Sequence, residues 1–329
     1  MKKINGVILS VPFRIHSFVT EFGKMYDKKE NHNFGGGLGF SVATDNFMKI
    51  KKTDRRVIRA PYKKVIGKYI DVFKKMYSYT GDFFVELEKG FPEHNGYGST
   101  IVIATVVCVG INILLGNKCS KTELNTIIFE NYCEEDLKGM CVEALTSGVG
   151  GLVMLFGGLI YMDNGNAFIR TEFSSNQKVV LFTTFQNESD KVYDVYDEFE
   201  LTEQYIEADI RDRDKKMKII QNSLIPSMLR RDFGEVAKAN DLLNEIGSGL
   251  VDCKQFKYDK QERLFSHIRQ IGASLVGISS AGPTAYALVE ADMDQVVVDL
   301  LVKEGIDRET IKVHNLDNRG IYVLKYIMD

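Results

Sequence analysis

Apolar and polar residues alternate near the start of the chain, which predicts a strand. Residues 7–15 are mostly apolar, and over residues 13–17 the two kinds of side chain alternate, so that Arg14 and His16 share one face. A polar segment follows and ends in Gly35-Gly36-Gly37-Leu38-Gly39-Phe40. Three successive glycines indicate a backbone with unusual dihedral angles or one that another group approaches closely, and a tight entry into a strand is the alternative.

Helical spacing of apolar residues begins in the next segment. Residues 64–79 are predicted as an amphipathic helix and residues 83–87 as a short strand. Residues 101–116 carry no charge and are predicted as a buried helix. Ser120 then stands at a helix N-cap with Glu123 at the capping-box position, which predicts a further helix to about residue 132.

The middle of the chain is predicted as helix, glycine-rich loop and two strands. The helix covers residues 134–145, and the loop is Thr146-Ser147-Gly148-Val149-Gly150-Gly151. The strands cover residues 152–155 and 158–162, about a turn at Phe156-Gly157. The composition then changes near residue 175, which predicts a boundary between domains of residues 1–175 and 176–329.

The second half of the chain is predicted to mix helices and strands. Residues 192–213 are rich in charge, and residues 211–216 are predicted as a solvated link or a helix start. Helices are predicted at residues 214–225, 232–246, 260–271 and 293–303, and strands at residues 178–184, 275–279, 285–290 and 321–327. This order favours a sheet with helices on one side.

Composition bounds the class of protein. The 329 residues are 44% hydrophobic and 26% charged, which leaves room for two domains with full cores. The net charge of -3 gives no general reason to expect nucleic acid or an anionic membrane as a partner. The five cysteines form no Cys-x-x-Cys pair, which favours reduced thiols in a cytoplasmic protein without a structural metal.

Neither a signal peptide nor a membrane span is predicted. The N-terminus lacks a long apolar core and a small-residue cleavage site. The longest uncharged runs, residues 101–116 and 146–162, contain 16 and 17 residues, and the second is interrupted by five glycines. Both are shorter than the roughly 20 residues that span a bilayer.

The chemistry of the chain centres on a glycine-hydroxyl loop ahead of the helix at 101–116. Gly96-Tyr97-Gly98-Ser99-Thr100 leads directly into that helix, so its backbone N–H groups and the positive end of the helix dipole suit a phosphate. The basic segment at residues 49–64 is either a solvated face or a contribution to polyphosphate binding. Residues 277–284, between two predicted strands, form either a simple hairpin or part of a site.

These loops resemble motifs of the GHMP superfamily of small-molecule kinases. Pro92-Glu93-His94-Asn95-Gly96-Tyr97-Gly98-Ser99-Thr100 is similar to the second motif, Pro-x-x-x-Gly-Leu-Gly-Ser-Ser, and residues 279–284 are similar to the glycine-rich third motif. The resemblance implies an α+β, two-domain GHMP kinase-like fold. Each domain would be a mostly antiparallel sheet with helices packed on it, and the active site would lie between the domains.

Further details resemble one branch of the superfamily, the beta-ribofuranosylaminobenzene 5'-phosphate (beta-RFAP) synthases and related decarboxylating C-glycosyl transferases. The similar segments cover almost the whole chain: Arg14-Ile15-His16, Gly36-Gly37-Leu38-Gly39-Phe40, His94, Ser147-Gly148-Val149-Gly150, Phe156-Gly157-Gly158, Leu224-Ile225-Pro226-Ser227-Met228 and Ser279-Ser280-Ala281-Gly282-Pro283-Thr284-Ala285-Tyr286. Many GHMP kinases carry a catalytic aspartate where this chain has Gly150. Ile101 and Ala281 also depart from the synthases, which indicates a different acceptor.

The resemblance implies that phosphoribosyl pyrophosphate reacts with an aromatic or heteroaromatic carboxylic acid and loses pyrophosphate and carbon dioxide, with Mg²⁺ as cofactor. The phosphate- and substrate-binding candidates are Gly36, Gly37, Gly96, Gly98, Ser99, Thr100, Ser147, Gly148, Ser279, Ser280, Gly282 and Thr284, of which Ser99 and Thr100 are also the candidate metal ligands.

The catalytic candidates are Arg14, His16 and His94. Arg14 and His16 would hold the ribose phosphate or the acceptor carboxylate, unless His16 is only structural. His94 would be a phosphate donor or acid–base group, or a helix cap. Two other functions stay open, an ATP-dependent small-molecule kinase and an inactive GHMP-like binding protein. A homodimer is possible.

Overall fold

The structure is a computed structural model that describes residues 3–25, 34–89, 96–136, 138–163, 167–183, 195–255, 259–280 and 282–329. His94 and Ala281, two residues of interest in the sequence, lie outside this part. Within it, no helix is both long and apolar enough to span a bilayer.

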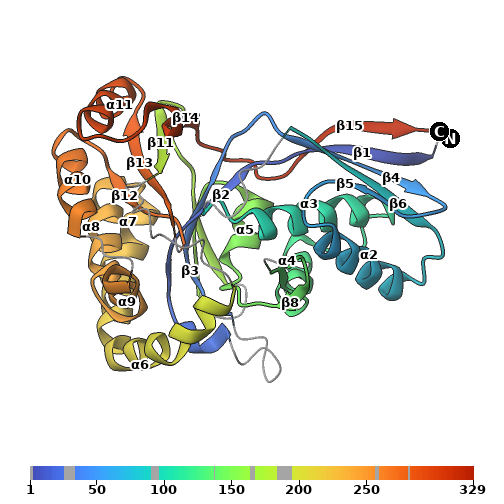
Figure 1. Ribbon diagram of the computed structural model, residues 1–329, viewed down its shortest axis with the longest axis horizontal. Helices are drawn as coiled ribbons and strands as arrows, with labels where there is room; N and C mark the ends of the chain where they lie inside the picture. Colours follow the sequence, from blue (N-terminus) through green and yellow to red (C-terminus); the bar gives the residue numbers. More distant parts are fainter. Residues whose placement is uncertain are drawn as a thin grey trace.

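The first layer is a five-stranded sheet at one end of the molecule (Figure 1). Its strands, in spatial order, are β15 (Val323–Met328), β1 (Ile4–Ser10), β4 (Phe47–Thr53), β6 (Asp82–Glu88) and β5 (Val57–Arg59). Helices α2 (Lys63–Tyr77) and α3 (Ser99–Leu114) pack beside each other next to this sheet. The last strand of the chain thus pairs with the first one.

A second sheet lies at the middle of the molecule and carries Arg14 and His16. Its strands are β10 (Phe168–Thr171), β9 (Leu159–Met162), β3 (Gly37–Val42) and β2 (Phe13–Val19), and the 3-10 turn η1 (Phe22–Met25) follows β2. Helix α5 (Val149–Phe156) packs against this sheet and against α3 and α4 (Lys121–Glu130). A small hairpin of β7 (Cys133–Glu135) and β8 (Cys141–Glu143) joins α4 to the loop before α5.

The remaining sheet belongs to the second half of the chain, together with most of the helices. Its strands are β12 (Leu275–Ile278), β13 (Thr284–Glu290), β11 (Gln177–Thr183) and β14 (Lys312–Asn315). The helical segments are α6 (Val195–Ile219), the π-helical η3 (Ile220–Leu224), α7 (Ile225–Arg230), α8 (Phe233–Asn244), α9 (Gly247–Gln255), α10 (Asp259–Gln270), α11 (Asp294–Lys303) and η4 (Arg308–Thr310). Helices α10 and α11 share an apolar core with this sheet.

The pairings agree with the predicted α+β architecture. Among the named strands of the described residues, every pairing is antiparallel except that of β5 with β6. The division into domains of residues 1–175 and 176–329 stays a prediction. Strand β15 comes from the second of these ranges but pairs with β1 from the first.

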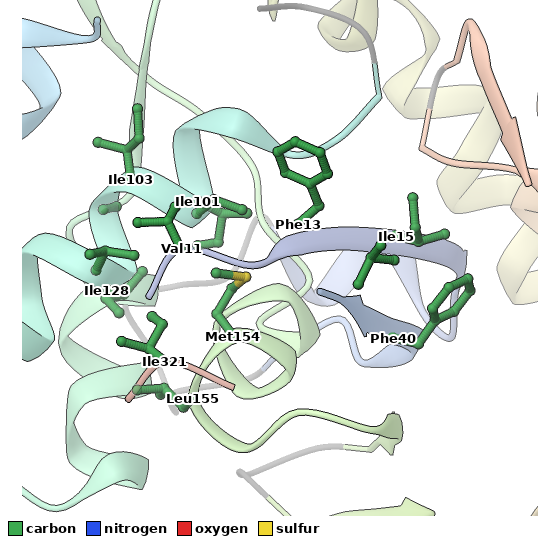
Figure 2. Close-up of a cluster of buried hydrophobic side chains, with 14 of the residues drawn as sticks. Val11, Phe13, Ile15, Phe40, Ile101, Ile103, Ile128, Met154, Leu155 and Ile321 are labelled. Atoms are coloured by element: carbon green, nitrogen blue, oxygen red, sulfur yellow. The ribbon is translucent and has the colours of Figure 1, made fainter. Parts of the chain in front are cut away.

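Helix α3 is uncharged because nearly all of its sides are buried. It touches α2, α4, α5 and strands of the first sheet, and Ile101, Val102 and Ile103 are at most 2% exposed. Figure 2 shows Ile101 and Ile103 in one cluster with Val11 and Met154. A helix that is apolar all round is expected in such a position.

Many local predictions are confirmed, including the helices at α2, α3 and α4 and the strands at β6, β9 and β11. At the start of α4, the backbone N–H of Glu123 donates to Ser120 Oγ at 3.2 Å and the backbone N–H of Ser120 donates to Glu123 Oε2 at 2.7 Å. This is the predicted capping box.

The predicted helix at residues 134–145 is wrong, because this segment forms strands β7 and β8 instead. Asp136 closes the turn between them by accepting hydrogen bonds from the backbone N–H groups of Lys138 and Met140, at 3.0 and 2.7 Å. Gly139 follows with a positive φ of 67°. Local side-chain-to-backbone bonds of this kind compete with helix formation.

The predicted strand at residues 152–155 is also wrong, since these residues lie in α5. A short apolar run can be a buried strand or a buried helix, and periodicity cannot distinguish the two. The charged segment at residues 211–216 is neither a link nor a helix start but part of the 25-residue helix α6. Helix α9 and strand β14 were not predicted.

Candidate functional site

The backbone at the starts of α3 and α5 lies close to the Arg14 side chain. A Cβ added at Gly98, which precedes α3, would lie 2.6 Å from Arg14 Nε, and one added at Gly150, in the first turn of α5, would lie 3.2 Å from the same atom. Gly98 also has a φ of 62°, which a side chain would disfavour. The guanidinium therefore packs against backbone at the positive ends of two helices, an arrangement that attracts an anion.

Ser99 and Thr100, in the first turn of α3, are buried beside this position. Their exposed fractions are 7% and 6%. The first bond within the helix joins the backbone N–H of Val102 to the carbonyl of Gly98 at 3.0 Å, so the N–H groups of residues 99–101 have no acceptor inside the helix. Ser99 Oγ is 2.7 Å from Tyr62 Oη.

Gly150 stands where many GHMP kinases are expected to carry an aspartate. Its α-carbon faces Arg14 and Ile101, whose nearest side-chain atoms would be 3.2 and 3.3 Å from an added Cβ. An aspartate here would require Arg14 and Ile101 to shift. Two of the three departures from the motifs, Gly150 and Ile101, are therefore neighbours, and Gly150 also lies beside Arg14.

His16 is buried next to Arg14 on strand β2. Burial and the charge of Arg14 lower its pKa from 6.5 to about 3, so the imidazole is neutral near pH 7. Its Nε2 is 3.3 Å from Ser147 Oγ, and its backbone N–H donates to Ser279 Oγ at 3.2 Å. A neutral and fixed ring suits hydrogen bonding and is a poor proton donor or acceptor near pH 7.

The stability of the fold should depend on pH through His16. Its pKa is lower in the folded than in the unfolded chain, so its contribution to the free energy of unfolding is complete above pH 6.5 and is lost as the pH falls toward 3. Between pH 6.5 and 5 the loss is roughly 2 kcal/mol. Urea unfolding at a series of pH values should show a shallower pH dependence for His16→Gln. An equal slope in both proteins would contradict the buried neutral ring.

Strands β12 and β13 pair as an antiparallel hairpin, the simpler of the two predicted alternatives, and Ser279 at its connection contacts the loop before α3. A role of this connection in a site stays a prediction. Ser279 Oγ donates to the carbonyl of Gly96 at 2.5 Å, and the backbone N–H of Gly282 donates to the carbonyl of Ser279 at 3.0 Å. Thr284 is buried, and its side chain hydrogen bonds to Tyr97. Ser280 is exposed and has a φ of 56°. Of these candidates, Ser280 is the one whose hydroxyl is open to a ligand.

The glycines at the start of β3 lie close to neighbouring backbone. A Cβ at Gly37 would be only 2.1 Å from the carbonyl oxygen of Phe18, and Gly37 has a φ of 143°. The N–H of Gly36 donates to the carbonyl of Ser147 at 3.0 Å. Gly148 begins α5 and packs against the Phe34 ring. Positive φ values and close neighbouring backbone therefore explain Gly36 and Gly37 at the entry to β3, and a role in substrate binding stays a prediction.

Three tyrosines near the site were not identified from the sequence. Tyr62 bonds to Ser99. Tyr132 is buried, and Arg14 is close enough to act on its pKa, although burial, which raises this pKa, is the larger effect. Tyr132 also donates to Glu134 Oε1 at 2.5 Å. Tyr97 packs on Phe13 with ring centroids 4.8 Å apart. Of the three, Tyr97 lies within the glycine-hydroxyl loop, so its position in that motif could have indicated it.

Three of the eight basic residues at positions 49–64, Lys49, Arg56 and Arg59, form ion pairs at the surface. Arg56 bonds to Asp71 and Asp82, and Arg59 pairs with Glu86 at 3.4 Å and lies over the Phe84 ring. These contacts favour a solvated face, the first of the two predicted alternatives.

The side chains near α3 do not by themselves form a resident Mg²⁺ site. Mg²⁺ prefers oxygen ligands, usually one or two carboxylates together with substrate phosphates and waters. Among the described residues, no group of three or more His, Cys, Asp or Glu side chains could hold a metal. Ser99 Oγ is already engaged by Tyr62. The hydroxyls of Ser99 and Thr100 would suit a Mg²⁺ ion that enters the site already bound to a diphosphate. Metal ligation by these two residues stays a proposal.

Comparison with known proteins supports the fold. No protein-family model and no curated protein sequence matches the chain. Among solved structures, mevalonate diphosphate decarboxylase from Staphylococcus aureus is 13% identical with a TM-score of 0.66, and 99% of each chain is covered. Homoserine kinase from Cytophaga hutchinsonii is 14% identical with a TM-score of 0.64, covering 97% of this chain and 98% of the kinase.

A third similar structure is MDDEF in complex with MVAPP, AMPPCP and magnesium, with 12% identity and a TM-score of 0.63 over 98% of this chain and 99% of that one. The matches extend over nearly the whole chain, so it has the two-domain GHMP kinase-like fold that its motifs predicted. At this level of identity the likeness concerns the fold alone.

Proposed function

We propose that the chain is a beta-RFAP synthase-like phosphoribosyl transferase. It would join phosphoribosyl pyrophosphate to an aromatic or heteroaromatic carboxylic acid and release pyrophosphate and carbon dioxide. The observation that carries the proposal is the Arg14 side chain between the first turns of α3 and α5, against the glycine that replaces the kinase aspartate.

This arrangement suits a diphosphate leaving group. The bond between the anomeric carbon and the diphosphate oxygen breaks, and negative charge grows on the departing group. In this proposal, that charge would be stabilised by the N–H groups of residues 99–101, the Ser99 and Thr100 hydroxyls and the Arg14 guanidinium. Mg²⁺ bound to the diphosphate would neutralise further charge.

The same arrangement needs no protein base. When a ring carbon attacks the anomeric carbon, the ring must lose a substituent to become aromatic again. If that substituent is a carboxylate, the electron pair of its C–C bond returns to the ring and CO₂ leaves, so no proton has to be removed. Gly150 cannot accept a proton, and the lowered pKa of His16 makes it a weak base.

The test is incubation of the purified chain with phosphoribosyl pyrophosphate, Mg²⁺ and a panel of aromatic and heteroaromatic carboxylic acids. We expect pyrophosphate and CO₂ in equal amounts with one class of acid. Omission of the acid serves as the control, because it separates transfer from hydrolysis. Release of neither product with any acid in the panel would refute the proposal.

A second candidate function is an ATP-dependent small-molecule kinase. It is favoured by the similarity to homoserine kinase and to a complex that holds AMPPCP and magnesium. Formation of ADP on an alcohol substrate, without use of phosphoribosyl pyrophosphate, would support it. Binding of either donor without turnover would instead support a GHMP-like binding protein.

A further inference from the structure

Tyr62 immediately precedes α2 and is held in an uncommon backbone conformation. Its φ of 55° and ψ of 46° are left-handed, which is disfavoured for a bulky residue, and its side chain is buried. Residues kept in such conformations are concentrated at functional sites, where the surrounding structure fixes them. The contacts of the Tyr62 side chain should therefore show what this conformation is for.

Contacts from both sides keep Tyr62 in place. Its carbonyl accepts the backbone N–H of Ile66 at 3.0 Å. Between Tyr62 and Ile66, the backbone N–H groups of Lys64 and Val65 donate to Glu135 Oε1 in strand β7, at 2.7 and 3.3 Å. Helix α2 thus begins on a carboxylate from a distant part of the chain instead of on a cap of its own. The phenol oxygen is thereby fixed 2.7 Å from Ser99 Oγ.

Either hydroxyl could donate in this hydrogen bond, and their chemistry favours one direction. A phenol is a stronger acid than an alkyl alcohol, so Tyr62 Oη is the better donor and Ser99 Oγ the acceptor. The Ser99 proton then has to point elsewhere. Because Ser99 lies in the first turn of α3, an anion bound at this helix end would be an acceptor within its reach.

We propose that Tyr62 is a positioning residue that orients the Ser99 hydroxyl as a hydrogen-bond donor to the bound diphosphate. The inference rests on the anion site of the proposed function. It assigns Ser99 to the diphosphate oxygens in preference to a metal ion, and it gives a role to a residue outside the glycine loop.

The test is the affinity for inorganic pyrophosphate with Mg²⁺, measured by isothermal titration calorimetry. Tyr62→Phe should weaken binding about 10-fold, which corresponds to about 1.4 kcal/mol. Tyr69→Phe is the matched control: Tyr69 is also buried in this region, but its hydroxyl donates to the carbonyl of Ile128 at 3.0 Å. Its affinity should change less than about twofold, because no site group is lost.

A double-mutant cycle separates positioning from a structural effect. If Tyr62 acts through Ser99, the double variant with Tyr62→Phe and Ser99→Ala should bind no more weakly than Ser99→Ala alone. Additive losses, or tighter binding by Tyr62→Phe, would overturn the inference. If the wild type binds pyrophosphate and Tyr62→Phe binds it with equal affinity, the inference about Tyr62 is overturned and the proposed function stays intact. Absence of pyrophosphate binding in the wild type would overturn both.

Discussion

Replacement of Arg14 by glutamine should weaken pyrophosphate binding by about 30-fold to several thousandfold. Loss of one member of a buried, hydrogen-bonded charge pair costs about 2–5 kcal/mol, and each 1.4 kcal/mol is a factor of about ten. Arg14 lies against Gly98, which precedes α3, and against Gly150 in the first turn of α5, so a diphosphate at these helix ends would contact it directly. Transfer of the phosphoribosyl group should fall at least as far, since the charge on the leaving group grows in the transition state.

The matched control is Arg170→Gln. Arg170 is also partly buried, but its guanidinium bonds to the carbonyls of Phe156 and Gly157, at 3.2 and 3.0 Å, and pairs with Glu172. This variant should lose stability and keep its affinity for pyrophosphate. Calorimetric titration of both variants, with their unfolding curves recorded in parallel, distinguishes the two effects. Equal losses of affinity would mean that Arg14 acts only through the fold.

Replacement of Lys216 by methionine should lower the free energy of unfolding by about 3–5 kcal/mol, because it leaves a buried carboxylate without its partner. Lys216 and Asp209, both in α6, are 3% and 2% exposed, and Lys216 Nζ lies 2.5 Å from Asp209 Oδ1. Nζ also donates to the carbonyls of Val19 and Thr20, at 3.1 and 3.2 Å. Those carbonyls are at the end of β2, the strand that carries Arg14, so the loss should also loosen the site.

Urea unfolding measures this prediction, and two further variants control it. Lys238→Met removes an exposed lysine that pairs with Glu235 at 2.6 Å, and should change stability by no more than about 0.5 kcal/mol. The double variant with Lys216→Met and Asp209→Leu should recover only part of the lost stability. An apolar pair can replace a buried ion pair, but Asp209 also accepts the backbone N–H groups of Phe22 and Ser248, at 2.8 and 2.7 Å. Equal effects of Lys216→Met and Lys238→Met would contradict the buried pair.

The sequence predicted those elements whose signals are local. Helix α3 follows from an uncharged run, and the start of α4 follows from Ser120 and Glu123, because a capping box forms within one turn. The helix predicted at residues 134–145 is wrong because the signal that decides the structure there is not in the spacing of apolar residues. Their helical spacing competes with a turn that the Asp136 side chain closes, and the spacing of apolar residues does not show such a bond.

The site shows the same division between local and distant signals. The glycine-hydroxyl loop and Arg14 were found as motifs, but their contact depends on how β2, α3 and α5 pack. Lys216 stands in a charged segment predicted as solvated, and it is buried because Asp209 and two carbonyls of a distant strand surround it. Tyr62 had no signal, since its partner Ser99 is 37 positions away along the chain.

In the proposed function, a diphosphate binds beside Arg14 at the starts of α3 and α5. A crystal structure of the chain with phosphoribosyl pyrophosphate and Mg²⁺ would show whether it does. We expect the diphosphate within hydrogen-bond distance of the N–H groups of residues 99–101 and of the Arg14 guanidinium, with the anomeric carbon facing Ser280. A diphosphate bound away from Arg14 and from the start of α3 would contradict the account.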